Sequence, residues 1–405
     1  MRVPRVARSL SVTASLIVMS AALASAQTSP ILPETHVIRG GPMSFYPTFA
    51  VRDAGTDSNV YNDQNGQKGD FTYSVVPRLF VVVPIANTRF VGTGFGNFVY
   101  FQTYKDQQSI SGVFEGRYEV VSPGFRPFAT AGFADRRERR GHEIDARVRQ
   151  RQTFMSIGSD MDVTSNTALV GWVRREITTW DRDATYEGAW LSEQLDYTSH
   201  TFAGGMRVRV TPFTTAGFTV EVERDRFDRA PLRDANKLLV GPSLDFNEGG
   251  AIIGHVNAGY QQFKPLSPLV ADYGGLAATS RLRFVFRDLL EVKFDADRDV
   301  DYSYDPLQPY YLESGGVVTL TQRVFGPVEV IAIGERRHLR HQRLGASSFD
   351  GRVETTRTVG GGFALQIQKR MRFELVYQRT TRTSSDPIGR DYERQRVFGS
   401  AIYGL

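Results

Sequence analysis

Charged side chains recur at every second position in several parts of this 405-residue sequence. Between residues 290 and 301 the odd positions carry carboxylates and one lysine, whereas the even positions begin with Leu290 and Val292. Just before this stretch, Arg281 and Arg283 alternate with apolar residues in the same way. Successive side chains of a strand point to opposite faces, so this spacing gathers the charges on one face. Rows of fixed charge of both signs are the chemistry with which a water-filled pore selects ions.

The same alternation predicts a set of pore-lining residues. An arginine or lysine that faces lipid from the middle of a membrane strand costs roughly 2–4 kcal/mol, so these charges must face water or one another. They would either tune transport or only brace the wall by pairing across strands, and the sequence leaves both possibilities open. The candidates are Arg207, Arg209, Glu221, Glu223, Arg281, Arg283, Glu291, Lys293, Asp295, Asp297, Arg372 and Glu374.

Catalytic and metal-binding patterns are weak in this chain. The nearest approach to a serine–histidine site is Ser199-His200, but adjacent residues of a strand point to opposite faces. Glu335, His338 and His341 lie close together in the sequence without a convincing metal-ligand spacing. We therefore expect no enzyme activity, no metal site and no cofactor.

The N-terminus predicts export from the cytoplasm. Three arginines precede a short apolar stretch that ends in Ala24-Ser25-Ala26, the pattern of a cleaved signal peptide over residues 1–26. The sequence has no cysteine, so lipidation at the processed end and disulfides are excluded. The formal charge of +5 falls to +2 when the three signal arginines are removed, and basic residues elsewhere are mixed with acids, which argues against a nucleic-acid partner.

The rest of the chain reads as one all-β domain. About 18 alternating runs (16–18) follow one another, from a first run at 43–53 to a last run at 392–405, and turns between them are alternately short and long. This rhythm is typical of a single antiparallel transmembrane β-barrel with short periplasmic turns and longer outer loops. We expect a short periplasmic segment at 27–42, the barrel at 43–405, and a location in the outer membrane of a Gram-negative cell.

The final strand carries an expected assembly signal. Val397, Tyr403 and the terminal Leu405 share one face of an extended strand, and the first two should face lipid. We expect the barrel-assembly machinery to recognise this strand. Aromatic residues near the outer strand ends are expected in an interfacial girdle, namely Trp180, Tyr302, Tyr304, Tyr310 and Tyr311.

The opening of the barrel resembles a known family. The segment 45–49 reads Phe-Tyr-Pro-Thr-Phe, residues 57–61 read Asp-Ser-Asn-Val-Tyr, and residues 70–73 read Asp-Phe-Thr-Tyr. These motifs resemble the start of outer-membrane proteins of the "beta-barrel porin 2" type, and repeated Arg-x-Phe/Tyr strands extend a looser likeness along the chain. The resemblance implies a barrel without catalytic residues. Some members of that family resemble proteins encoded with exopolysaccharide export systems.

These observations favour passive passage of small hydrophilic solutes through a charge-lined pore in the outer-membrane lipid. Two other functions stay open. The barrel could be an accessory to the export of an exopolysaccharide, or a non-conducting barrel whose loops bind partners. Stable conductance in a planar bilayer separates the passive channel from the non-conducting barrel. A neighbouring polymer-export gene cluster would favour the accessory role in exopolysaccharide export.

Overall fold

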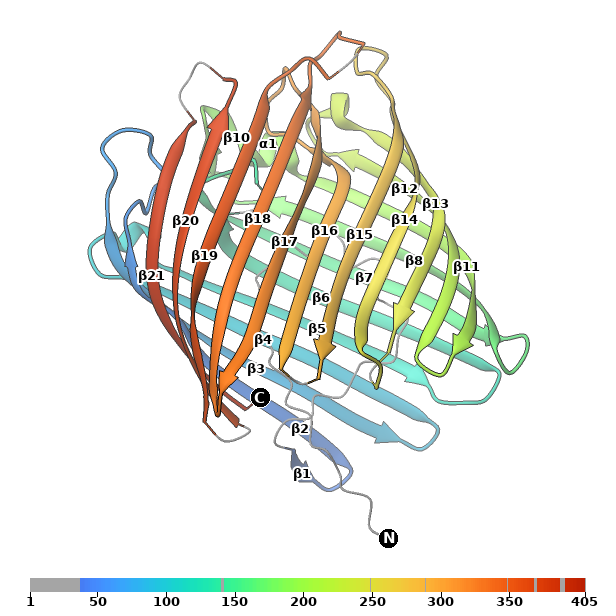
Figure 1. Cartoon of the computed structure of the whole chain (residues 1–405). Coiled ribbons are helices and arrows are strands. Elements are labelled where there is room, and N and C mark those ends of the chain that lie inside the picture. The colour runs from blue at the N-terminus through green and yellow to red at the C-terminus, as the bar shows by residue number, and fades with distance from the viewer. Residues whose placement is uncertain are drawn as a thin grey trace.

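Eighteen long strands form one closed antiparallel barrel in the computed structural model (Figure 1). The structure describes residues 37–404 except 140–141, 248, 288, 348, 368–369 and 387–389. The predicted signal peptide and Leu405 lie outside the described residues. The barrel strands are β2 (Met43–Asp57), β3 (Asp70–Ile85), β4 (Thr88–Phe101), β5 (Ser109–Val120), β6 (Phe125–Arg139), β7 (Arg147–Asp162), β8 (Thr167–Trp180), β11 (Tyr197–Thr211), β12 (Thr214–Phe227), β13 (Ala235–Phe246), β14 (Ile252–Pro265), β15 (Tyr273–Phe286), β16 (Leu290–Tyr302), β17 (Tyr310–Phe325), β18 (Val328–Gln342), β19 (Val353–Ile367), β20 (Met371–Ser384) and β21 (Tyr392–Tyr403).

Each strand pairs with its neighbours in the sequence, and β2 pairs with β21 to close the barrel. The short strand β1 (Ile38–Gly40) extends β2 as a hairpin. Loops at the opposite end hold the remaining elements, which are η2 (Lys105–Gln107), β9 (Thr185–Tyr186), β10 (Ala189–Trp190), α1 (Leu191–Leu195) and η3 (Pro231–Arg233). Within the described ranges, no helix has the length and apolarity needed to cross a bilayer.

The turns at the two ends of the barrel differ as the sequence predicts. Two-residue connections join β3 to β4 and β11 to β12, as the pairs of Ile85 with Thr88 and of Thr211 with Thr214 show. Ala86, in the first of these turns, has a φ of 50°, the left-handed conformation that tight hairpins favour. The other end carries long loops such as 181–196. Short turns therefore mark the periplasmic end, where β2 begins and β21 ends (Figure 1).

The predicted strand ends lie close to the observed ones, with the largest difference in the first strand. The sequence predicts a run that ends at residue 53, but β2 continues to Asp57. The register of β2 shifts by one residue against both β3 and β21 near Arg52 and Asp53, and Asp53 has a φ of 52°. This β-bulge inserts one extra residue, which interrupts the alternation on which the prediction depends.

Alternation sorts the side chains between two environments. Outward-facing residues are large, apolar and exposed at the surface, for example Phe114, Ile157 and Phe363. Their immediate neighbours face the lumen and include buried polar groups such as Glu119 and Arg372. The outer wall therefore suits lipid, and neighbouring strands pair along most of their lengths within the closed sheet, as a bilayer requires.

One hairpin leaves the wall near its outer end. β15 pairs with β16 only as far as Ala278 and Arg298, although β15 continues to Tyr273 and β16 to Tyr302. Beyond this point the tip of the β16–β17 hairpin packs among residues of the lumen, where Tyr302 contacts Phe227. The outer end of the lumen is thus partly filled by the wall itself.

Candidate functional site

The lumen contains a polar cavity beneath the outer loops. Its volume is about 230 Å³, and its lining comes from strands β7 to β18 together with the loop 142–146. Five of the predicted pore-lining residues lie in this lining, and they are Glu221, Glu223, Arg281, Asp295 and Asp297. Alternation on β12, β15 and β16 accounts for their common orientation, because on each strand they occupy every second position on the face opposite outward residues such as Val220, Leu282 and Phe294.

The other candidates also lie on the lumen face but outside the cavity. Glu291 holds a cluster in which Arg283 Nε lies 2.7 Å and Lys293 Nζ 3.1 Å from its two carboxylate oxygens. Arg372 is buried and binds Glu374 at 2.6 Å as well as Glu329. These pairs lie toward the periplasmic half of their strands. Arg283–Glu291 and Arg372–Glu329 join different strands, whereas Lys293–Glu291 and Arg372–Glu374 lie along one strand each.

Two predicted residues lie apart from both groups, on β11. Arg207 Nη2 lies 3.6 Å from the carboxylate of Asp160 on β7. Arg209 is exposed close to the periplasmic end of the strand. The structure therefore divides the twelve candidates between an outer cavity, a braced inner wall and a small basic region.

Carboxylates dominate the cavity lining. Among the described residues that line it, nine are Asp or Glu and four are Arg or Lys. Asp299, Asp301 and Glu313 belong to this acidic set and were absent from the sequence-based candidates. The alternation of β16 continues through Asp299 and Asp301, so the sequence contained the signal for these two.

Lys237 is the most important residue that sequence reasoning missed. Its Nζ lies 2.8 Å from Glu223 Oε1 and 3.2 Å from Asp225 Oδ2, and the Tyr302 hydroxyl donates to Asp225 Oδ2 at 2.6 Å. Arg337, also missed, binds Asp297 and lies 3.2 Å from Glu313. Five of the nine lining carboxylates lie in ion pairs, and no ion pair within 4 Å is present among the described residues for Glu221, Asp295 and Asp299.

Several acceptors in the lining have no donor. Gln261 is buried and donates through Nε2 to Asp299 Oδ1 at 2.6 Å, while its Oε1 has no hydrogen-bond partner among the described residues. Asp295 and Glu221 make no ion pair within 4 Å in the part of the chain that the structure describes. A surface of this kind offers acceptors and negative charge to a solute that carries N–H donors.

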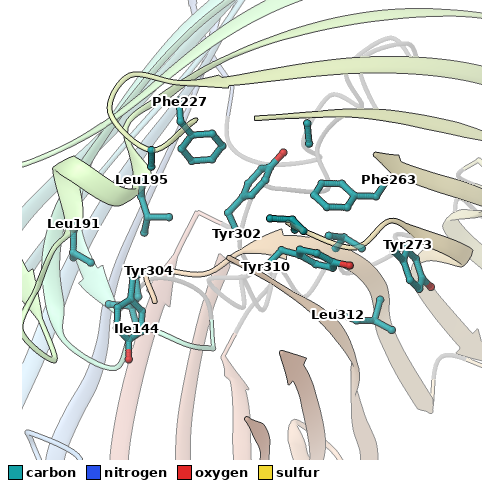
Figure 2. Close-up of a cluster of buried hydrophobic side chains, with 14 of the residues drawn as sticks. Ile144, Leu191, Leu195, Phe227, Phe263, Tyr273, Tyr302, Tyr304, Tyr310 and Leu312 are labelled. Carbon is teal, nitrogen blue, oxygen red and sulfur yellow. The ribbon is translucent and has the colours of Figure 1, made fainter. Parts of the chain in front are cut away.

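The outer loops form a plug across the mouth of the barrel. We define the mouth plug as loop residues 142–146, 181–196 and 303–309 together with the aromatic strand ends that they contact. Its apolar part joins residues of β8, of β12 to β17 and of the loops in one buried cluster, as Figure 2 shows for Ile144, Leu191, Leu195, Phe227, Phe263, Tyr273, Tyr302, Tyr304, Tyr310 and Leu312. Because these side chains are almost fully buried, the plug is a packed structure.

A buried carboxylate fixes the loop 142–146 within the plug. Glu143 Oε1 accepts hydrogen bonds from Ser303 Oγ and Arg352 Nη2, both at 2.6 Å, and lies 3.0 Å from His341 Nε2. Burial opposes the charge of this carboxylate, but the contacts with His341, Arg352 and Ser303 outweigh it and lower its pKa to about 2. Asp145 in the same loop binds Arg382 of β20 at 2.8 Å.

The predicted aromatic girdle is wrong for the residues on which it was based. Trp180, Tyr302, Tyr304, Tyr310 and Tyr311 are buried within the lumen or the plug and do not reach the lipid-facing surface. Aromatic residues at strand ends suit both the membrane interface and the packed plug, because each environment offers an apolar surface beside polar groups. Tyr403, in contrast, is exposed on the outer wall near the periplasmic end.

Comparison with known proteins identifies the family. The family described as "Putative beta-barrel porin 2" matches residues 34–401. The chain belongs to this family. The resemblance expected from the opening motifs is thus confirmed. Among curated proteins, none matches this chain.

Solved structures similar to this chain include two proteins of Pseudomonas aeruginosa. OccK2 (OpdF), crystallised with glucuronate, is 11% identical, with 89% of this chain and 98% of that chain covered and a TM-score of 0.50. OpdK with vanillate is 10% identical, with the same coverage and a TM-score of 0.49. At 11% identity the likeness to OccK2 shows the barrel fold alone. Membership of the family makes this beta-barrel porin 2 protein a porin-like outer-membrane channel for small solutes, as the sequence predicts.

Proposed function

We propose that this protein is a passive channel for small hydrophilic solutes and that it prefers cations. The observation that carries the proposal is the acidic cavity, in which nine carboxylates face four Arg or Lys side chains. Fixed negative charge in a narrow aqueous passage raises the local concentration of cations and lowers that of anions. The charged face of the strands then tunes transport as well as bracing the wall.

The proposed division of labour follows the two charge groups. Glu221, Asp295 and Asp297 form part of the filter, since they line the cavity directly. Arg283, Glu291, Lys293, Arg372 and Glu374 brace the inner wall, since each is engaged in a short ion pair. Arg207 and Arg209 act at the periplasmic exit.

The mouth plug specifically favours a second candidate function. A packed apolar cluster across the outer end of the lumen is the feature expected of a non-conducting barrel whose loops bind partners. An accessory role in polysaccharide export would require a polymer to pass this plug, and we place it behind the other two. In all three cases we propose that the barrel performs no catalysis and uses no cofactor.

We further propose the predicted maturation route. The signal peptide 1–26 is removed, residues 27–42 remain in the periplasm, and the barrel-assembly machinery recognises the terminal strand through Val397, Tyr403 and Leu405. Val397 and Tyr403 are exposed on the outer wall, which suits this role. The mass of the mature protein from an outer-membrane preparation tests the cleavage site.

Planar bilayers test the channel and its selectivity together. Purified protein under a gradient of potassium chloride should give stable conductance steps and a reversal potential of the sign for cations. Repeating the measurement with arginine hydrochloride and with sodium glutamate compares a cationic and an anionic solute of similar size. Silent bilayers would overturn the channel in favour of the non-conducting barrel, and an anion-selective current would overturn the role of the acidic cavity.

A further inference from the structure

A shallow apolar groove runs over the outward faces of β7, β8, β11 and β12. Its volume is about 600 Å³. One row of directly paired residues forms its outer part, and this row comprises Ile157, Val173, Phe202 and Val222. The next row, on the periplasmic side of the first, contains Gly171 directly opposite Gly204. The groove exists because two glycines replace side chains in a wall that is otherwise bulky.

Packing of the barrel does not require these two glycines. A Cβ added at Gly171 would approach its nearest neighbour, the Ala203 carbonyl oxygen, at 3.7 Å, and one at Gly204 would lie 3.8 Å from the Val170 oxygen. Both distances are ordinary contacts. Glycine inside a strand weakens it, since it adds backbone entropy to the unfolded chain and leaves no side chain to pack. Its presence at two opposed outward positions is better explained by a surface ligand that needs the space.

A row of basic residues lies immediately beyond the groove, toward the outer loops. Arg175 and Arg224 both pair directly with His200, which lies between them on β11. All three are exposed, and none makes a hydrogen bond or ion pair with another described residue. Arg175 and Arg224 lie one strand to either side of His200, with no carboxylate on the described outward faces of these three strands, so the row is complementary to an anion from outside the protein.

Charge is sorted sharply between the two faces of these strands. The acidic residues of β8, β11 and β12 all lie on the lumen face, where Glu176, Glu221 and Glu223 line the cavity. The outward faces of the same three strands carry basic residues, apolar residues and a few threonines and, within their described lengths, no carboxylate. Through Asn236, the basic row continues to the exposed Lys264 of β14.

We propose that the groove and the basic row form a binding site for a phosphorylated glycolipid of the outer leaflet. One acyl chain lies in the groove over Gly171 and Gly204, and a headgroup phosphate binds Arg175 and Arg224. The guanidinium group matches phosphate oxygens with two parallel hydrogen bonds. β8 and β12 run toward the outer loops, so the basic row lies on the outer side of the groove, as the orientation of an outer-leaflet lipid requires.

Native mass spectrometry of the purified barrel with lipid A tests the site. The double variant Arg175→Gln/Arg224→Gln should weaken lipid A binding by on the order of thirty-fold, if each arginine contributes as basic residues at anionic membranes do. The double variant Gly171→Val/Gly204→Val fills the groove and should weaken binding while leaving the basic row intact. Arg151→Gln is the matched control, because Arg151 is also outward-facing on β7 but is neutralised by Asp135 and Asp181, both at 3.2 Å.

A competition measurement identifies the ligand, and two control measurements exclude misfolding of the variants. Inorganic pyrophosphate should compete weakly and be insensitive to Gly171→Val/Gly204→Val, whereas a free-phosphate site would bind it as tightly as lipid A. The mobility of unheated protein in detergent gels reports the folded barrel, and conductance should equal that of the wild type because these side chains face away from the lumen. Wild-type binding by either double variant, or an equal loss in Arg151→Gln, would overturn the proposal.

Discussion

The mouth plug should open when Glu143 loses its charge. Glu143→Gln keeps the size of the side chain and one acceptor oxygen but removes the charge that Arg352 and His341 contact. The pKa of Glu143 falls from 4.5 to about 2, and each unit corresponds to about 1.36 kcal/mol, so the contacts outweigh the cost of burying the charge by about 3 kcal/mol. Removal of one partner from a buried ion pair costs a similar amount, roughly 3–5 kcal/mol.

An energy of this size changes the balance between closed and open plug strongly. Every 1.4 kcal/mol is tenfold, so about 3 kcal/mol raises the ratio of open to closed loop on the order of a hundredfold. The barrel itself should stay folded, because Glu143 lies in a loop and joins loop to strand ends. In planar bilayers, Glu143→Gln should therefore show longer open times and a larger mean conductance than the wild type.

The dependence on pH has a definite sign. The pKa of Glu143 is lowered in the folded plug, so its stabilising effect is complete above pH 4.5 and is lost as the pH falls toward 2. Wild-type channels should open more often across this window, and the part of the change due to Glu143 should be missing from Glu143→Gln. Glu193→Gln is the control, since Glu193 pairs with Arg229 at 3.6 Å while both side chains are at least half exposed. Identical open times in all three proteins would refute the assignment of Glu143 as the clamp.

Three further predictions concern the lumen, the inner wall and the terminal strand. Asp295→Asn should lower the permeability ratio of cations to anions by about two- to threefold, because one charge about 7 Å from an ion in water contributes roughly 0.6 kcal/mol. A reversal potential equal to that of the wild type would show that Asp295 is not part of the filter. Arg372→Met should destabilise the barrel by roughly 3 kcal/mol in urea unfolding from vesicles, because it leaves Glu374 buried without its cation and leaves Glu329 with Arg323 alone, at 3.7 Å. Further replacement of both glutamates by glutamine should restore most of this loss, and a stable single variant would contradict the bracing role. Val397→Lys should reduce the amount of folded barrel more than Tyr403→Lys, because Val397 lies in the middle of β21 and Tyr403 at its end. A lysine costs roughly 2–4 kcal/mol at the bilayer midplane and about 0–1 kcal/mol near the interface. Equal yields of the two variants in outer-membrane fractions would argue against this depth dependence.

The architecture could be predicted because alternation survives nearly unbroken along each strand. The first predicted run begins at residue 43 and the last at residue 392, which are the first residues of β2 and β21. A residue that faces lipid must be apolar and its neighbour must not be, so the pattern is strong even where mean hydropathy is low. It failed only where the backbone departs from the regular sheet, as at the bulge of β2.

The interior of the mouth could not be predicted from the same rule. By alternation, Tyr302 shares the face of the outward Phe294, yet it is buried against Phe227 and Phe263. The reason is the departure of the β16–β17 hairpin from β15 beyond Arg298, which turns an outward face toward the lumen. Long-range contacts such as Glu143 with Arg352 depend on where loops meet in space, which periodicity along the chain does not encode.

Sorting of charge between the faces has a consequence for barrels in general. The mature chain is expected to carry a small positive charge, yet its cavity is acidic and the outward face of β8, β11 and β12 is basic. A solute in the lumen responds to the carboxylates a few ångströms away, and a lipid on the outer wall responds to the arginines, since each interaction is local and water and salt screen the rest. Net charge therefore predicts neither the selectivity of such a pore nor its lipid contacts. The side of the strand on which each charge falls decides both, and that side is set residue by residue by the register of the sheet.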